Sequence, residues 1–156
     1  VLVGVNAAAL ALARIARGLG WDVSLVDHRE AAEAPPGLAP GVRLLRAEPG
    51  EVAGAVSLDA RSFAVVMTHN LERDIEYLRA LLPPPLAYLG AIGSRQRAQK
   101  LLQGCEAAAP RVRAPAGLDI GSETPEEIAL AIAAEILAVT TGRMGTPLSA
   151  SSGPIH

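Results

Sequence analysis

The chain has 156 residues, half of them apolar and only 3% aromatic, and its formal net charge is −2. This length suits one domain with an apolar core of its own. The small charge, the scattered arginines and the scarcity of aromatic side chains for base stacking argue against a nucleic-acid partner.

The cysteine content and the apolar segments favour a cytoplasmic protein. Cys105 is the only cysteine, so no disulfide can form within the chain, as is usual in a reducing compartment. No signal peptide is recognisable at Val1. The most apolar helical segment, residues 128–139, is too short to cross a bilayer and contains Glu135. We therefore expect no membrane partner.

Strands and helices alternate along the chain. Short aliphatic runs predict strands, and apolar residues three or four apart predict helices. The predicted strands are residues 1–5, 21–27, 42–47, 62–69 and 86–90; the predicted helices are 7–20, 71–82, 94–104 and 122–139, with a brief helix within 50–58. This order predicts an α/β fold with a doubly wound, mostly parallel, Rossmann-like sheet of five or six strands and helices on both faces.

One domain and a tail are expected. Residues 1–141 should form the Rossmann-like domain, and residues 142–156, rich in Gly, Ser, Thr and Pro, a loosely ordered C-terminal tail. In such sheets ligands bind at the carboxyl ends of the strands, near the point where the strand order reverses. The candidate binding residues are therefore sought at the strand ends.

The turn after the first strand partly matches a dinucleotide-binding pattern. That pattern, Gly-x-Gly-x-x-Gly or -Ala, uses its middle glycine to let a pyrophosphate approach the helix start. Here Gly4 and Ala9 match, but Asn6 stands at the middle position. Asn tolerates a left-handed backbone, yet its side chain takes room from the phosphate. Gly4 and Asn6 are candidate cofactor contacts with a weakened nucleotide pattern; helix packing is the alternative role of Gly4 and Ala9.

Polar residues also end the second and fourth strands. Asp27 stands about twenty residues after the first turn, where an acid would hold the ribose hydroxyls, and Arg29 could instead meet a phosphate. Thr68 and His69 end the fourth strand on a loop that a ligand could contact. A polar loop without a ligand is the alternative. No metal-binding spacing surrounds His69, and no base supports a Ser or Thr nucleophile, so we assign no metal ligand and no catalytic residue.

The stretch GAIGSR, residues 90–95, joins the fifth strand to a helix. Gly90 and Gly93 allow a tight turn, and Ser94 is a predicted N-cap. Arg95 and, two residues later, Arg97 add positive charge beside the unpaired amides of the helix start. Such a junction can bind an anion. The alternative is a plain strand-helix connection, for which glycine is equally suitable.

The last predicted helix has a clear start. Thr124 and Glu127 form a capping-box pattern, with Pro125 at the first helical position. Capping does not explain Gly117 and Gly121, which suggest a loop pressed against another segment or a ligand.

Several segments together resemble the XdhC/CoxI family of accessory proteins for molybdenum hydroxylases such as xanthine dehydrogenase and carbon monoxide dehydrogenase. They are ALARIARGLGWDVSLVDHR, VVMTHNLERD, YLGAIGSRQRAQKL, APAGLDIGSETPEEIALAIAAEI and the PL…GPIH ending. The likeness corresponds to that family's C-terminal Rossmann-like domain. Two features depart from it: Val5, Asn6 and Ala7 replace the family's Gly-Ala-Gly-His turn, and the N-terminal domain with its cysteine motif is absent from these residues.

The resemblance implies a maturation factor rather than an enzyme with turnover of its own. It implies that the chain binds molybdenum cofactor (molybdopterin, a pterin bearing a phosphate) or a related nucleotide, and aids its sulfuration and insertion. The implied partners are a molybdenum hydroxylase apoenzyme, a sulfur-donating cysteine desulfurase and a second copy of the chain.

Two further functions stay open. An NAD(P)-dependent oxidoreductase is favoured by the strand order and by Asp27, but Asn6 weakens the nucleotide turn and only His69 could serve as an acid-base group. A nucleotide-sensing or structural dimer module is the third interpretation.

Overall fold

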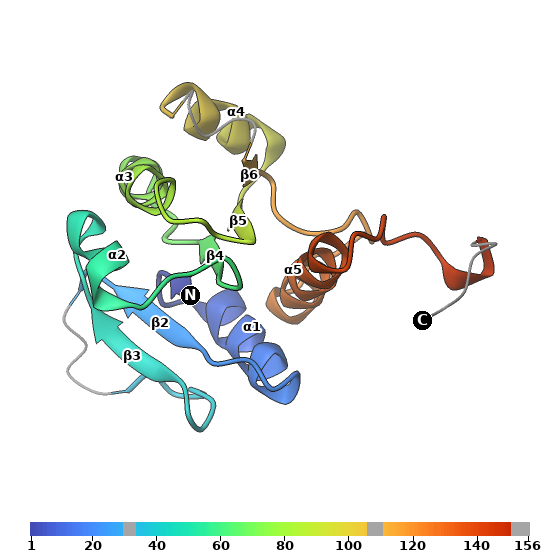
Figure 1. The fold of residues 1–156 in the computed structure, drawn as a ribbon, viewed down its shortest axis with the longest axis horizontal. Coiled ribbons are helices and arrows are strands. Elements are labelled where there is room, and N and C mark those ends of the chain that lie inside the picture. The colour runs from blue at the N-terminus through green and yellow to red at the C-terminus, as the bar shows by residue number, and fades with distance from the viewer. Residues whose placement is uncertain (30–33, 106–110, 151–156) are drawn as a thin grey trace.

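The computed structural model describes residues 1–29, 34–105 and 111–150 (Figure 1). Six strands and five α-helices alternate in it. In chain order the elements are β1 (Leu2–Val3), α1 (Ala7–Gly18), β2 (Ser24–Asp27), β3 (Arg43–Arg46), η1 (Pro49–Glu51), α2 (Val52–Ala55), β4 (Phe63–Val66), α3 (Leu71–Leu81), β5 (Tyr88–Ala91), α4 (Arg95–Gln103), β6 (Val112–Arg113), α5 (Pro125–Thr140) and η3 (Leu148–Ala150).

The six strands form a single parallel sheet in the order β3-β2-β1-β4-β5-β6. This is the doubly wound order of a Rossmann fold, so the predicted fold class is confirmed. The chain runs outward from β1 to β3, then returns to pair β4 with the other side of β1. The strand order therefore reverses between β1 and β4, and a crevice at their carboxyl ends is the expected place for a ligand.

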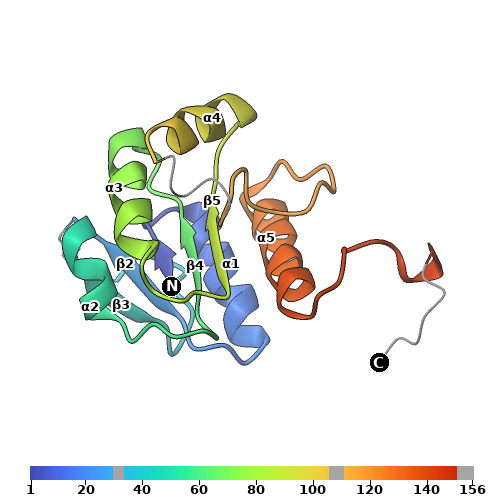
Figure 2. The same ribbon diagram turned by 45° about the horizontal axis from the view of Figure 1, so that its top comes forward.

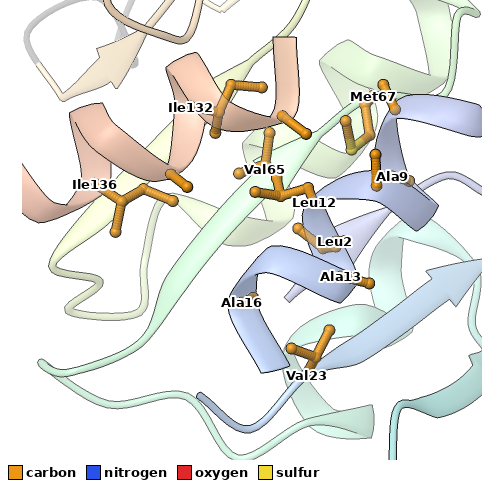
Figure 3. Packing of buried hydrophobic residues seen from close by; sticks show 14 of the residues in the cluster. Leu2, Ala9, Leu12, Ala13, Ala16, Val23, Val65, Met67, Ile132 and Ile136 are labelled. Carbon is orange, nitrogen blue, oxygen red and sulfur yellow. The ribbon is translucent and has the colours of Figure 1, made fainter. Parts of the chain in front are cut away.

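Successive residues of each strand point to opposite faces of the sheet, and each face has its own apolar core. On one face Leu2 and Val65 pack against α1 and α5, through side chains such as Leu12 and Ile132 (Figure 3). On the other face strand residues such as Val66 pack against α2, α3 and α4. Figures 1 and 2 show α1 and α5 side by side on their face of the sheet.

The strands are shorter than their apolar runs predict. The first strand ends at Val3 because Gly4 has a φ of +101°, which turns the chain out of the sheet. The fourth ends at Val66, so Met67, Thr68 and His69 belong to the loop that follows. β6, with two residues, has no periodic pattern of its own, and the sequence does not indicate it as a separate strand.

The segment after α5 leads away from the body of the domain (Figures 1 and 2). Residues 141–150 are all exposed, although residues 148–150 form the short helix η3. The loosely ordered tail over residues 142–156 stays a prediction, and its residues 151–156 lie outside the described part of the chain. None of the described helices combines the length and the hydropathy that a bilayer crossing requires.

Candidate functional site

The turn after β1 is held against β4 by Gly4 and Asn6. A Cβ atom on Gly4 would lie 2.7 Å from the Cα atom of Thr68, so only glycine fits this approach of two backbones. Asn6 has an extended backbone rather than a left-handed one, and it is the N-cap of α1. Its Oδ1 accepts a hydrogen bond from the amide of Ala9 (3.0 Å), while its Nδ2 donates to the oxygen of Met67 (2.6 Å).

This cap has a consequence for nucleotide binding. In a dinucleotide site the free amides of this helix start face the pyrophosphate. Here the Asn6 side chain already accepts from one of them and occupies the space where the middle glycine would stand. The first turn is therefore a structural joint between β1, α1 and the segment after β4, and a weakened contact with a phosphate stays a prediction.

Asp27 at the end of β2 is buried, and both of its carboxylate oxygens are engaged. Oδ1 accepts from the amide and Nε of Arg29, each at 2.9 Å, and Oδ2 accepts from Nη2 of Arg29 and from the amide of Val5, each at 2.8 Å. Burial alone would raise the pKa of Asp27, but the hydrogen bonds from Arg29 and Val5 outweigh burial and lower the pKa to about 2. The carboxyl group of Asp27 is thus ionised at neutral pH and already paired with the guanidinium of Arg29.

The end of β2 therefore differs from that of an NAD-binding protein of this fold, in which the acid accepts hydrogen bonds from the ribose. A free ribose diol would have to displace Arg29 from Asp27 to reach a carboxylate oxygen. The Arg29 side chain is 64% exposed, so a cation covers the acid on the solvent side. Nδ1 of His28 is buried 3.5 Å from Asp27 and has no hydrogen-bond partner among the described residues.

The loop after β4 contains Thr68 and His69 and is tied down by a buried carboxylate. Asp74, on α3, is fully buried, and its Oδ1 accepts from the amide (3.0 Å) and the hydroxyl (2.6 Å) of Thr68. His69 is exposed and has a φ of +64°, a left-handed conformation that is rare for residues with a Cβ atom. The loop therefore presents the imidazole of His69 to solvent from a constrained backbone, which is a frequent feature of binding sites.

The junction after β5 has the predicted turn and helix start. Ser94 is the N-cap of α4, and its hydroxyl accepts from the amide of Arg97 (3.2 Å). Gly93 has a positive φ of +147°, and Arg95 is exposed at the first position of the helix. Gly90 lies within β5 and not in the turn: its missing side chain makes room for the ring of Tyr88, which would be 2.7 Å from a Cβ atom.

One run of contacts connects these loops at the carboxyl edge of the sheet. The carboxylate of Asp27 accepts from the amide of Val5 in the first turn. The side chain of Asn6 donates to the oxygen of Met67, just after β4. The carboxylate of Asp74 accepts from the amide of Thr68 in the loop that follows. The second oxygen of Asp74 accepts from Nη2 of Arg97 on α4 (2.6 Å). The sequence indicates Arg97 as a cation near the helix start, but it does not indicate Asp74 or the ion pair between the two.

A cavity in the described part of the chain lies away from these loops. It has a volume of about 500 Å³ and opens at the opposite, amino edge of the sheet, beside the contacting rings of Trp21 and Phe63. None of the predicted site residues lines it. Within the part of the chain that the structure describes, no three His, Cys, Asp or Glu side chains gather closely enough to hold a metal ion.

Comparison with known proteins places the chain in a family. The model of the XdhC Rossmann domain matches residues 1–136. The chain belongs to the XdhC Rossmann-domain family. The match covers the sheet, the loops after β1, β2, β4 and β5, and most of α5, but not the PL…GPIH ending that also contributes to the sequence resemblance.

Two curated relatives and a solved structure are similar to this XdhC Rossmann domain. It is 34% identical to the uncharacterized protein YqeB of Escherichia coli over 99% of the chain and 29% of YqeB. It is 31% identical to a probable xanthine dehydrogenase subunit of Bacillus subtilis over 88% of the chain and 41% of that protein. The crystal structure of a xanthine dehydrogenase from Bacillus halodurans superposes with a TM-score of 0.79 at 26% identity, over 97% of the chain and 44% of that protein. The chain thus spans less than half the length of each of these relatives.

Proposed function

We propose that this chain is the cofactor-holding domain of a maturation factor for a molybdenum hydroxylase of the xanthine dehydrogenase type. Its ligand is molybdenum cofactor, or a related nucleotide, bound by its phosphate at the carboxyl-edge crevice. The family and the two relatives named as xanthine dehydrogenases support a role in the xanthine dehydrogenase system. The arrangement of the crevice supports the role of a holder.

The observation that carries this proposal is that the carboxylate of Asp27 is already fully hydrogen-bonded within the chain. In a nicotinamide enzyme of this fold the acid at the end of β2 accepts hydrogen bonds from the ribose. Here both oxygens of Asp27 are engaged by Arg29 and Val5. With Asn6 in the pyrophosphate turn, the chain lacks the two features that hold a dinucleotide. The start of α4 is also capped, by Ser94, but it adds the exposed cation of Arg95, which the start of α1 does not have.

The residues present fit the phosphate of such a cofactor. Amides at a helix start and an arginine beside them form charge-assisted hydrogen bonds to phosphate oxygens. Ser94 and Arg95 would hold the phosphate, and His69, on the neighbouring loop, would contact the pterin ring. When bound, the cofactor supplies the redox-active molybdenum of the hydroxylase; the chain itself binds and orients it.

Transfer requires partners. We propose that a molybdenum hydroxylase apoenzyme receives the cofactor and that a cysteine desulfurase supplies the sulfur. Cys105 is 6% exposed beneath α4 and is therefore not placed to carry sulfur between proteins.

A nicotinamide oxidoreductase is the second candidate, favoured by the Rossmann strand order. One experiment separates the two. The purified protein is incubated with molybdenum cofactor released from a molybdoenzyme, or with NAD(H) or NADP(H), and passed over a gel-filtration column. We expect the pterin, detected by its fluorescence after oxidation, to co-elute with the protein. Co-elution of the nicotinamide nucleotide alone would replace the proposal with the oxidoreductase.

A further inference from the structure

A buried ion pair joins the β4 loop to the helix after β5. Asp74 on α3 has 0% of its side chain exposed and is 2.6 Å from Nη2 of Arg97 on α4. Its other oxygen holds the amide and hydroxyl of Thr68. The β4 loop and the first turn of α4 are therefore bonded to a single carboxylate.

The turn at Gly93 is shaped around the arginine of this pair. A Cβ atom on Gly93 would lie 2.6 Å from Cδ of Arg97, so any other residue would collide with the arginine side chain. The helix start and the path of Arg97 thus depend on each other. Gly93 therefore makes room for the Arg97 side chain, in addition to allowing a phosphate to approach the turn.

The guanidinium of Arg97 still has hydrogen-bond donors to offer. A quarter of its side chain is exposed, and within residues 1–29, 34–105 and 111–150 its side chain donates only to Asp74, through Nη2. Nε and Nη1 donate to no other group among these residues. An arginine can bind a carboxylate with one part of its planar fork and a phosphate with another, which lysine cannot reproduce.

A purely structural role would be served as well by other residues. Burying two charges costs desolvation energy, and a well-packed apolar pair is often at least as stable. A carboxylate that binds both the β4 loop and the arginine does, however, fix the direction of a guanidinium, which an apolar pair cannot do.

We propose that Arg97 is a phosphate contact of the crevice, in addition to Arg95, and that Asp74 is the positioning residue that aims its guanidinium. This inference rests on the proposed function, since it concerns the same ligand. It places the phosphate between the β4 loop and the turn after β5, against the guanidinium of Arg97, whose orientation is fixed by the buried carboxylate of Asp74.

The test uses the fluorescent oxidised pterin derivative of molybdenum cofactor, with its phosphate and after removal of the phosphate by a phosphatase. Binding of each form is titrated by fluorescence to the wild-type chain and to Arg97→Lys. The lysine keeps a cation on Asp74, so the melting temperature should change little. We expect the affinity for the phosphorylated form to fall about tenfold, because one charge-assisted contact is lost, and the affinity for the dephosphorylated form to stay the same.

Two further variants keep the test decisive. Arg79→Lys is the matched control, since Arg79 is an exposed arginine that bonds Gly104 at the other end of α4; it should bind both forms like the wild type. Asp74→Asn keeps an oxygen for Thr68 but releases Arg97, and should also lose affinity for the phosphorylated form alone. If Arg97→Lys does not fold, Asp74→Asn tests the role of Arg97 in its place.

The outcomes separate the two proposals. A wild-type chain that prefers the phosphorylated form, with an equal preference in Arg97→Lys and Asp74→Asn, would overturn the role of Arg97 and leave the proposed function standing. A wild-type chain that binds neither form, or both equally, would overturn the phosphate site and the proposed function with it.

Discussion

Asn6 bridges the two strands between which the sheet order reverses: its Nδ2 donates to the main-chain oxygen of Met67 at 2.6 Å. The same side chain caps α1 by accepting from the amide of Ala9. A residue that stands where a nucleotide-binding protein has glycine therefore ties the β1 turn to the segment after β4 and caps α1.

Replacing Asn6 by glycine should open the turn to nucleotides. In Asn6→Gly the helix amides become free, and we expect the affinity for NAD⁺, measured by calorimetry, to rise about threefold or more. The free energy of unfolding should fall by roughly 1–2 kcal/mol, because the bond to Met67 and the cap are lost. Asn6→Ala is the control, since it loses the same bonds but keeps a Cβ atom. An unchanged NAD⁺ affinity in Asn6→Gly would show that Asn6 is not the obstacle.

Gly4 should tolerate no side chain. Gly4→Ala places a Cβ atom 2.7 Å from the Cα atom of Thr68 and forces alanine to a φ of +101°. We expect the free energy of unfolding, from urea denaturation, to fall by roughly 2–4 kcal/mol. Gly18→Ala is the matched control: its Cβ atom meets nothing within 4 Å at the end of α1, and the change should be neutral or slightly stabilising. Equal stabilities of the two variants would contradict this account of the turn.

The ion pair of Asp27 should make stability depend on pH in the acid range. The pKa of Asp27 falls from 3.8 to about 2 on folding, so its contribution is complete above the unfolded value and is lost as the pH falls through 2. The difference in unfolding free energy between the wild type and Asp27→Asn should be about 1–2 kcal/mol at pH 7. It should shrink steadily between pH 5 and pH 2. A difference that stays constant over this range would mean that Asp27 is not the titrating group.

Arg95 should matter for the ligand and not for the fold. Loss of its charge-assisted contact in Arg95→Ala should weaken cofactor binding by roughly 1.5–3 kcal/mol. Arg79→Ala, which changes an exposed arginine far from the turn, should bind like the wild type. Both variants are first checked for an unchanged circular dichroism spectrum. If the two bind alike, the stretch from Gly90 to Arg95 is only a strand-helix connection.

Hydride transfer is not expected. With Asp27 engaged by Arg29 and Asn6 in the first turn, no purine, aldehyde or hydroxy acid should support steady reduction of NAD(P)⁺, followed by the absorbance of the reduced nicotinamide. Reduction that disappears in His69→Ala would establish the oxidoreductase instead.

The sheet and its helix starts are predictable because they depend on local patterns. Aliphatic runs bounded by turns indicate five of the strands, and the side chains of Ser94 and Thr124 cap their helices as their positions suggest. Asn6 stands out in the sequence for the glycine it replaces, but its bond to Met67 joins residues 61 positions apart. No local pattern contains such a contact.

The buried position of Asp74 and its pairing with Arg97 are not predicted from the sequence for a related reason. In the helix from Leu71 to Leu81 an acid among charged neighbours suggests a solvated surface. A signal is nevertheless present: Asp74 falls on the same helix face as Leu71 and Leu78, where an apolar residue is expected. A carboxylate on the apolar face of a helix indicates a buried partner, but only the tertiary structure identifies that partner as Arg97.

The packing of α1 against α5 has a consequence for the way the chain is made. α1 comes from the beginning of the sequence, yet it packs in one core with Ile132 and Ile136 near the other end. While the ribosome is still adding residues, one face of the sheet lacks half of its cover. This core is therefore completed only after synthesis of α5, and an aliphatic face that stays uncovered until then is the kind of surface that is prone to aggregation.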